Sequence, residues 1–321
     1  DVPESADFVM YWWQHAAISV RRDALEQFGF ITTNSIGQAF NRRVLESHFS
    51  DKKHSISLLF VIPDHPWVDT ADGAAVRIAM TVAGKSAHTA GRLLHVVSEG
   101  DFVKGEAEVS LSERRGQIHS DLRLGANVAA ASELRANLGV SNRGFCLFGA
   151  GFIVTQQKAV ALGMGKVQGL ESCIRHYRNG RDLTDKPRGV LVIDLFGLSA
   201  EEVRIRYPAV YQHVLERVKP ERDHNKRESR KRNWWIFGEP NPLIRSQLRG
   251  LSRYIATAVT AKHRVFQFLD TSLLPDDALT CIASEDAIDL GVLSSIVHVI
   301  WALSNGATLE DRPRYLKSRC F

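Results

Sequence analysis

The chain has 321 residues, 44% hydrophobic and 24% charged, a composition that is ordinary for a globular protein of one or two domains. Its net charge of +5 and isoelectric point near 9.1 permit a polyanionic partner without requiring one. The apolar runs fall short of the roughly 20 residues that cross a bilayer, and no charged-then-apolar leader opens the sequence, so we expect neither a membrane span nor export.

The first part of the chain alternates between helical and strand patterns. Apolar residues recur at helical spacing from residue 6 to about 28, "FGFITTN" is a short β-rich run, and "GQAFNRRVLESHF" is helical again. "SISLLFVIP" and "AAVRIAMTVAG" then predict two further strands. Strand, helix and strand at this density predict an α/β fold with a parallel or mixed sheet, too short for a whole doubly wound domain.

A polar, charged stretch from about residue 99 to 137 predicts a crossover between two domains, 1–115 and 116–321, with the boundary near Gly116. Beyond it lie the short β-like runs "GFCLFGAGFIVT", "RGVLVIDLFGL", "RYIATAVT", "RVFQFLD" and "LTCIAS". Helical patterns cover about 200–219 and 290–304. The second domain is therefore predicted to be α+β.

Nothing in the sequence predicts a metal site or a catalytic nucleophile. The four cysteines have no C-x-x-C spacing, and the histidines form no pair at zinc-ligand intervals, which favours a reducing cytosol. The glycine patterns "FGAGF" at 148–152 and "GMGKVQG" at 163–169 do not follow a strand and open a helix as a phosphate-binding loop does. We predict that both are simple turns.

The run "ERVKPERDHNKRESRKRNWW", residues 216–235, is dense in Lys and Arg and ends in two tryptophans. It is either a solvated helix end or a surface that contacts DNA phosphates, with the indole rings available for packing or stacking. The candidate phosphate contacts are Lys226, Arg227, Arg230, Lys231 and Arg232.

Two further segments carry candidate DNA contacts. Trp67 follows a Pro where a loop feeds a strand, so it is either an exposed aromatic at a binding edge or a cap on the core. In "LEDRPRY", Glu310, Arg312 and Arg314 alternate, and the Pro between the two arginines favours extended backbone that would project all three from one side. Such a row suits base reading, because Arg pairs with guanine and Glu accepts from cytosine; the alternative is a surface salt-bridge turn.

These residues converge on a family. "ADFVMYWWQHAA", "FGFITTNSIGQAFNRRVLE" and "PDHPWVDTADGAAVRIAMTV" resemble the second half of the Rossmann-like catalytic domain of adenine-specific DNA methyltransferases of the MmeI-like group, which are type IIL and IIG restriction-modification enzymes. The later segments "YRNGRDLTDKPRGVLVIDLFGL", "NWWIFGEP" and "LEDRPRYLKSRCF" resemble the target-recognition domain of the same group.

The resemblance implies a prokaryotic cytoplasmic enzyme of restriction-modification or phage defence that transfers methyl from S-adenosylmethionine to a flipped-out adenine in double-stranded DNA. It also implies that Trp67 stacks on the adenine, that residues 310–314 set sequence specificity, and that a nuclease domain can share the parent polypeptide. The family's N-P-P-aromatic motif is absent from these residues. We therefore expect the catalytic residues and most of the cofactor loop upstream, and no methylation by this chain alone.

Two alternatives remain open. The chain could be a non-catalytic DNA-specificity module that depends on a partner for methyl transfer, which the missing motif favours and the retained half-sheet disfavours. It could also be an unrelated α/β enzyme such as a dehydrogenase, which depends only on the weak glycine patterns.

Overall fold

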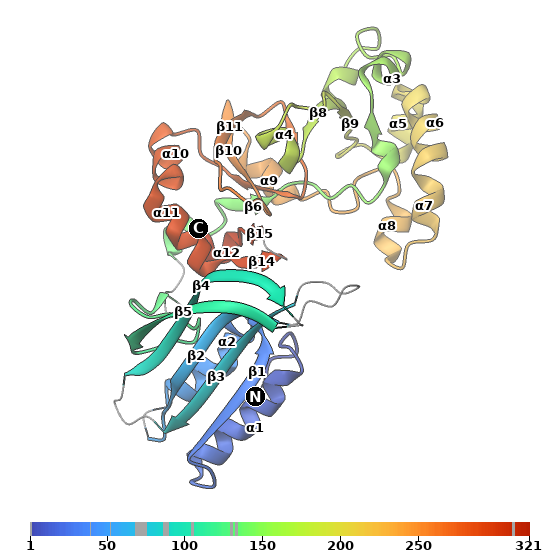
Figure 1. Cartoon of the computed structure of the whole chain (residues 1–321). Helices are drawn as coiled ribbons and strands as arrows, with labels where there is room; N and C mark the ends of the chain where they lie inside the picture. Colours follow the sequence, from blue (N-terminus) through green and yellow to red (C-terminus); the bar gives the residue numbers. More distant parts are fainter. Residues whose placement is uncertain are drawn as a thin grey trace. The chain divides into compact units, whose positions relative to one another are not determined.

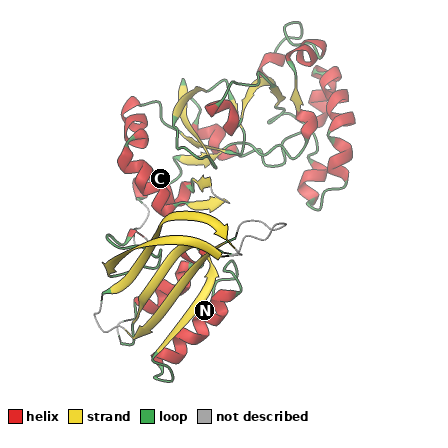
Figure 2. Ribbon diagram, in the orientation of Figure 1, coloured by secondary structure: helices red, strands yellow, loops and turns green. Residues whose placement is uncertain are grey.

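The computed structural model describes residues 2–38, 40–51, 53–67, 76–85, 90–103, 106–128, 131, 134–309 and 312–321, with the backbone alone at 101–103, 106–107 and 308–309 (Figures 1 and 2). The chain divides into two compact units, Asp1–Ser132 and Glu133–Phe321. The mixture of helices and sheets confirms the predicted α/β class. The boundary near Gly116 was placed too early, because Ile118 and Leu122 are buried in the core of the first unit.

The first unit is built on one five-stranded sheet in the order β1-β3-β2-β4-β5. β3 runs antiparallel to both β1 and β2, so those two strands are parallel to each other, and α2 lies between them in the chain. β2 and β4 are parallel neighbours, and β4 and β5 form an antiparallel hairpin. The elements are α1 (Val9–Arg21), β1 (Gln27–Thr33), the 3-10 helix η1 (Asn34–Gly37), α2 (Arg42–Phe49), β2 (Ile56–Pro66), β3 (Arg77–Lys85), β4 (Gly91–Val103) and β5 (Glu106–Gly116).

The core of the first unit lies between the sheet and its two helices (Figure 1). Trp13 of α1 is fully buried, and its ring centroid lies 5.1 Å from that of Phe28 on β1 and 6.3 Å from that of Phe49 on α2. The buried positions of α1 are spaced three or four residues apart, as a helix with one apolar face requires. They are Met10, Trp13, Ala17 and Val20.

The second unit contains two four-stranded sheets, in the orders β11-β10-β13-β6 and β12-β8-β9-β7, and a β14–β15 hairpin. Its strands are β6 (Ser141–Arg143), β7 (Ile153–Val154), β8 (Ile174–Arg178), β9 (Leu191–Ile193), β10 (Arg253–Ala258), β11 (Gln267–Asp270), β12 (Leu274–Pro275), β13 (Leu279–Ile282), β14 (Ala307–Leu309) and β15 (Arg312–Arg314). Its α-helices are α3 (Gln156–Ala161), α4 (Gly180–Thr184), α5 (Ala200–Arg206), α6 (Pro208–Arg217), α7 (Lys219–Asp223), α8 (Glu228–Arg232), α9 (Pro242–Gln247), α10 (Ala287–Ser294), α11 (Ile296–Asn305) and α12 (Lys317–Cys320).

Strand β10 joins the two cores of the second unit. Tyr254, Ala256 and Ala258 pack into the larger core, whereas Ile255 packs into the smaller core beneath α10, α11 and α12. Successive side chains of a strand point to opposite faces, so β10 is covered on both sides. Its antiparallel neighbours β11 and β13 also occupy both of its edges.

Three predicted elements differ from the structure for identifiable reasons. The stretch predicted as a polar crossover contains most of the β4–β5 hairpin, because "EVSLS" alternates apolar and polar residues within a strongly charged segment. The long helix expected over 200–219 breaks at Pro208, which starts α6, because proline cannot donate to the preceding turn. The pattern over 290–304 also breaks, at Ser295, whose hydroxyl accepts a hydrogen bond from the His298 N–H and caps α11.

The helices of the described residues include no single one that is long and apolar enough to span a membrane; only α10 and α11 together, bent by 62°, have that length and composition. The glycine pattern at 163–169 is a turn, as predicted, since Gly163, Gly165 and Gly169 all have positive φ.

Buried His48 should make the stability of the first unit depend on pH. Burial and the nearby Arg21 lower the pKa of His48 from 6.5 to about 4. Its ring lies 2.7 Å (Nε2) from the Gln14 Oε1 and 3.4 Å (Nδ1) from the Arg21 guanidinium, contacts that suit the neutral ring. Because the folded pKa is below the unfolded one, this stabilisation is complete above pH 6.5 and is lost as the pH falls toward 4.

We therefore expect the free energy of unfolding to fall by about 2–3 kcal/mol over that interval because of this one ring. Urea unfolding of the wild type and of His48→Gln at a series of pH values tests this, because the variant should have the flatter profile. Identical profiles would contradict the assignment.

Candidate functional site

A cavity of about 550 Å³ opens at the end of strand β1 in the first unit. Trp67, which directly follows β2, forms part of its wall, and the Trp67 N–H donates to the Val76 carbonyl at 3.0 Å. Residues 68–75, between these two, lie outside the described residues. The lining is mostly apolar, with one carboxylate: Asp7, Val9, Ile31, Thr32, Thr33, Trp67, Val76 and Ile78.

The carboxylate at this cavity, Asp7, is held by a reciprocal pair with buried Asn41. The Asp7 N–H donates to Asn41 Oδ1, and Asn41 Nδ2 donates to Asp7 Oδ2, both at 2.8 Å. The Ser35 hydroxyl also donates to Asp7 Oδ2, at 2.6 Å. The two bonds to the carboxylate both end on Oδ2, so Oδ1 accepts no hydrogen bond among the described residues. The carboxylate therefore has a fixed position and a spare acceptor.

A chain of ion pairs supports the same end of the sheet. Arg77, between cavity residues Val76 and Ile78, donates from Nε to Asp64 at 2.7 Å and from its terminal nitrogens to Glu99 at 2.8 and 3.2 Å. These contacts, to Glu99 and then Asp64, raise the pKa of Arg77, and the Arg77 guanidinium lowers the pKa of Glu99. The ends of β2, β3 and β4 are thereby tied together beside the cavity.

The structure decides between the two interpretations of Trp67. Its side chain is 45% exposed and lines a cavity, so the interpretation as a cap on the core is wrong. Stacking on a base stays a prediction. Sequence reasoning missed Asp7, because its partner Asn41 is 34 residues away and nothing in the local pattern connects them.

The segment predicted to read bases is an antiparallel hairpin of the second unit. β15 pairs with β14 in the register Ala307↔Arg314 and Leu309↔Arg312. Residues 312–314 are extended, as predicted, so Arg312 and Arg314 point to the same side. Arg312 is exposed and Arg314 is partly buried. Glu310 lies outside the described residues.

The hairpin is held in place by the loop that follows β10. The Tyr315 N–H donates to the Val259 carbonyl at 2.7 Å, and the Ala261 N–H donates to the Pro313 carbonyl at 3.2 Å. The Arg264 guanidinium also donates to the Pro313 carbonyl, at 3.3 Å. On the same loop, exposed Lys262 and His263 line a cavity of about 280 Å³ with Pro313. Cationic side chains thus gather around the hairpin.

The basic run 216–235 supplies fewer free cations than predicted. Arg230 is a correction: it is buried, its guanidinium carbon lies 3.4 Å from the Phe148 ring centroid, and it donates to Glu239 at 2.7 Å. Arg227 pairs with the same Glu239 at 3.1 Å, and Lys231 lies 3.8 Å from Glu228. Phosphate contact by Lys226, Arg227, Lys231 and Arg232 stays a prediction.

The two tryptophans that end this run pack against the protein and do not extend into solvent. Trp234 is 9% exposed, and the Trp235 indole N–H donates to the Leu198 carbonyl at 2.8 Å. Their rings meet edge to face with centroids 6.1 Å apart. Both indoles therefore belong to the core and its margin, not to a stacking surface.

Comparison with solved structures shows which known protein has a similar fold. The solved structure of the type IIL restriction-modification enzyme MmeI in complex with DNA matches with a TM-score of 0.74 and 19% identity, over 99% of this chain and 42% of the MmeI chain. This chain thus has the fold of less than half of that protein. The type IIG restriction endonuclease BpuSI matches 92% of this chain and 39% of its own at a TM-score of 0.32 and 9% identity, too weakly to establish a shared fold. No protein-family model and no curated protein matches the chain.

The buried position of Arg230 generates a stability prediction. Arg230→Ala should lower the free energy of unfolding of the second unit by roughly 2 kcal/mol, because it removes a stacked cation from Phe148 and its ion pair with Glu239. Lys226→Ala, at an exposed position of the same run, is the matched control and should change stability by less than about 0.5 kcal/mol. Chemical denaturation of both variants measures the difference; equal stabilities would mean that Arg230 is not structural.

Proposed function

We propose that this chain is the base-holding and sequence-reading part of a site-specific DNA adenine-N6 methyltransferase of a restriction-modification or phage-defence system. The observation that carries the proposal is the cavity at the end of β1, where an exposed Trp and a fixed carboxylate meet. The fold shared with MmeI, a restriction-modification enzyme solved with DNA, supports it.

The cavity suits the chemistry of base methylation. An enzyme that modifies a base must take it out of the stack and hold it by aromatic stacking and by hydrogen bonds to its edge. Trp67 supplies the aromatic face, and the free Oδ1 of Asp7 supplies an acceptor for the exocyclic amino group of adenine. The other apolar side chains of the lining, such as Ile31 and Val76, offer further contact to the faces of a base.

S-adenosylmethionine, when bound, supplies the methyl group. Among the described residues of the first unit, no glycine-rich loop follows a strand and opens a helix, so we assign none of them to this cofactor. The proposal assigns that loop and the N-P-P-aromatic motif to another part of the complete protein. Edge strand β1, which pairs only with β3 in the described sheet, and exposed Phe8 and Trp12 of α1 suit a sheet that continues beyond β1.

The second unit supplies the DNA contacts in this proposal. The rigid β14–β15 hairpin presents Arg312 and Arg314 for base edges, since Arg pairs bidentately with guanine O6 and N7. The exposed cations of the run 216–235 contact phosphate instead, because phosphate contacts position a protein without reading sequence.

The alternative is a DNA-specificity module without catalysis. The second unit favours it, because it has complete cores of its own, whereas the sheet of the first unit has an open edge. Purified complete protein, incubated with unmethylated genomic DNA and S-adenosylmethionine, tests the two. We expect N6-methyladenine within one sequence motif; specific DNA binding without methylation would replace the methyltransferase proposal with the module.

Trp67→Ala in the complete protein should impair base flipping and leave duplex binding nearly unchanged. Stacking on an aromatic side chain is worth roughly 1–3 kcal/mol per base, so the flipped state should be about 5- to 150-fold less populated. Fluorescence of 2-aminopurine at the target position measures flipping, and Leu111→Ala, also exposed in the first unit but outside the cavity, is the control. Unchanged flipping in Trp67→Ala would remove Trp67 from the site.

Exchanging Glu310 and Arg312 in the complete enzyme should alter one position of the methylated motif and keep the others. If these side chains address one G·C pair, each mismatch there should cost roughly 1–3 kcal/mol. Genome-wide mapping of methylated adenines reads the motif directly, with Lys317→Ala as a control beyond the hairpin. An unchanged motif at normal activity would exclude the pair as base readers.

A further inference from the structure

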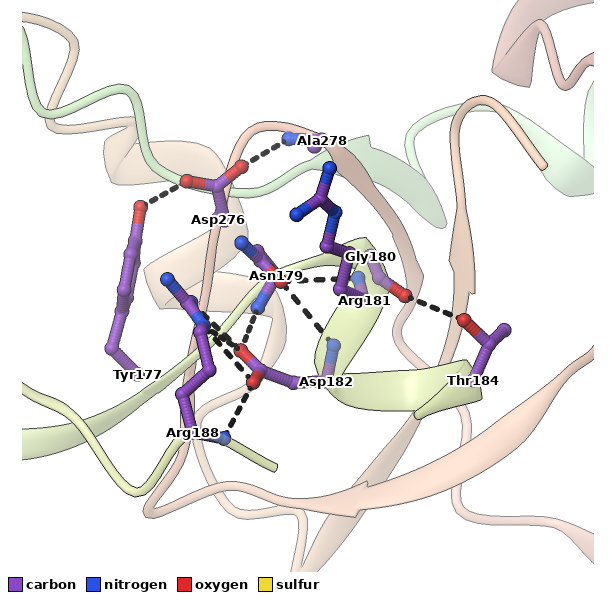
Figure 3. Close-up of polar contacts among 9 residues, drawn as sticks. All are labelled: Tyr177, Asn179, Gly180, Arg181, Asp182, Thr184, Arg188, Asp276 and Ala278. Carbon is purple, nitrogen blue, oxygen red and sulfur yellow. Dashed lines mark hydrogen bonds and ion pairs between the residues drawn. The ribbon is translucent and has the colours of Figure 1, made fainter. Parts of the chain in front are cut away.

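The loop between β8 and β9, residues 179–190, contains a short helix, α4, with a complete capping box (Figure 3). Asn179 Oδ1 accepts the N–H groups of Arg181 and Asp182 at 3.0 and 3.3 Å, and Asp182 Oδ2 accepts the Asn179 N–H at 2.9 Å. The start of α4 is therefore fixed by reciprocal bonds. We call residues 179–190 the α4 loop.

Arg188, near the other end of the α4 loop, also bonds to Asp182. Arg188 donates its backbone N–H to Asp182 at 2.9 Å and its guanidinium to the same carboxylate at 2.8 Å, as Figure 3 draws. Burial alone would raise the pKa of Asp182, but the bonds from Arg188 and Asn179 outweigh it and lower the pKa to about 2. Asp182 is thus an internal, permanently charged brace, and only 1% of its side chain is exposed.

The braced loop is attached to the strands beside it. A Cβ built on Gly180 would lie 3.3 Å from the Cβ of Ala258, at the end of β10, so the backbones approach closely there. Gln267 of β11 donates to the Leu183 carbonyl at 2.8 Å. Next to the loop, the Tyr177 hydroxyl donates to Asp276 (Figure 3). Such attachments give the loop a defined position relative to β10.

The side chain of Arg181 makes no hydrogen bond or ion pair within the described part of the α4 loop and its surroundings. Its backbone N–H serves the capping box, but its guanidinium is exposed and has no ion pair or hydrogen bond among the described residues (Figure 3). The nearby acids have other partners: Arg188 holds Asp182, and Asp276 accepts from Tyr177 and from the Ala278 N–H. Asp185, four residues after Arg181, accepts the Lys186 N–H at 2.8 Å and forms no ion pair with Arg181. By contrast, exposed Arg204 on α5 pairs with Glu201 at 2.6 Å.

The α4 loop and the reading hairpin are attached to the same end of β10. Gly180 lies against Ala258, and two residues further along the chain Thr260 forms a β-bridge with Arg314. Two residues of extended chain span about 7 Å, so both attachments fall within one short edge of the unit. That edge also carries exposed Lys262 and His263, and Arg181 extends its positive charge.

We propose that Arg181 holds a phosphate of duplex DNA and so fixes the register at which the β14–β15 hairpin meets the bases. This inference rests on the proposed DNA-reading function of the second unit. A cation on a fixed support, whose guanidinium has no ion pair among the described residues, is suited to phosphate, to which a guanidinium binds bidentately. Contacts of this kind position the protein and carry no sequence information.

Fluorescence anisotropy of the 321-residue chain with long duplex DNA, at salt concentrations from about 50 to 200 mM, tests the proposal. Arg181→Ala should weaken binding on the order of tenfold at the lowest salt and reduce the log–log salt slope by about 0.9. Arg181→Lys should keep the slope, because it keeps the charge. Arg204→Ala, the matched control, should bind as the wild type does, because its guanidinium already has a carboxylate partner.

Selection of preferred sequences from a random duplex pool completes the experiment, and Arg181→Ala should select the same sequences as the wild type. An affinity and slope equal to the wild type in Arg181→Ala would overturn the proposal, and a changed sequence preference would overturn the assignment to phosphate. A wild-type chain that does not bind duplex DNA would instead refute the DNA-reading function itself. Thermal unfolding of Arg181→Ala should match the wild type, because the side chain is exposed.

Discussion

The second unit depends on burying both faces of β10. A strand covered on both sides and paired on both edges cannot shift its register without exposing one core or the other. Ile255 and Ala256, neighbours in the chain, pack into different cores, so the position of β10 is fixed from two directions. Two of the elements that we assign to DNA contact take their position from the end of this strand: the α4 loop contacts Ala258, and the β14–β15 hairpin is bonded to the loop that follows it. A rigid scaffold with variable side chains at its edge is the arrangement that recognition sites require.

Arginine has two separate uses in the second unit, and this distinction matters more than the net charge. Arg222 is fully buried and donates to the Leu147 and Ile236 carbonyls, and Arg230 stacks on Phe148. Arg245 lies over Phe145 and Phe196 and pairs with Asp194 at 2.7 Å. A planar guanidinium can stack and donate at once, so such residues are structural despite their charge. The cations that remain available to an anionic partner are exposed and lie on loops and helix ends, where the fold needs their backbones rather than their side chains.

The sequence predicted the strands that have a clear apolar pattern, but it did not predict contacts between residues that are far apart in the chain. Strands β1, β2 and β3 follow from apolar runs, whereas the sequence left open whether Trp67 is exposed or caps the core. The β4–β5 hairpin was hidden because charge density outweighed a clear alternation in "EVSLS". Arg230 was assigned to phosphate because a run of cations does not indicate which side chain meets an aromatic ring 82 residues earlier in the chain. The pairing of Asp7 with Asn41 could not be predicted for the same reason: a reciprocal hydrogen bond between distant residues produces no pattern in the local sequence.

In the proposed function, the base-reading side chain at position 312 can change while the backbone attachments of the hairpin stay the same. Its attachments to the rest of the unit are made by backbone groups: the Tyr315 N–H to Val259, the Ala261 N–H to Pro313, and the carbonyl of Pro313 to Arg264. None of these bonds depends on the side chain at position 312, which is exposed. An exposed substitution away from cores, caps and buried pairs changes stability by only about 0.5 kcal/mol, whereas a lost bidentate base contact costs about 1–3 kcal/mol of discrimination. If Arg312 reads a base as proposed, its substitution should therefore change recognition more than folding, because the hairpin is attached through the backbone of Pro313 and Tyr315.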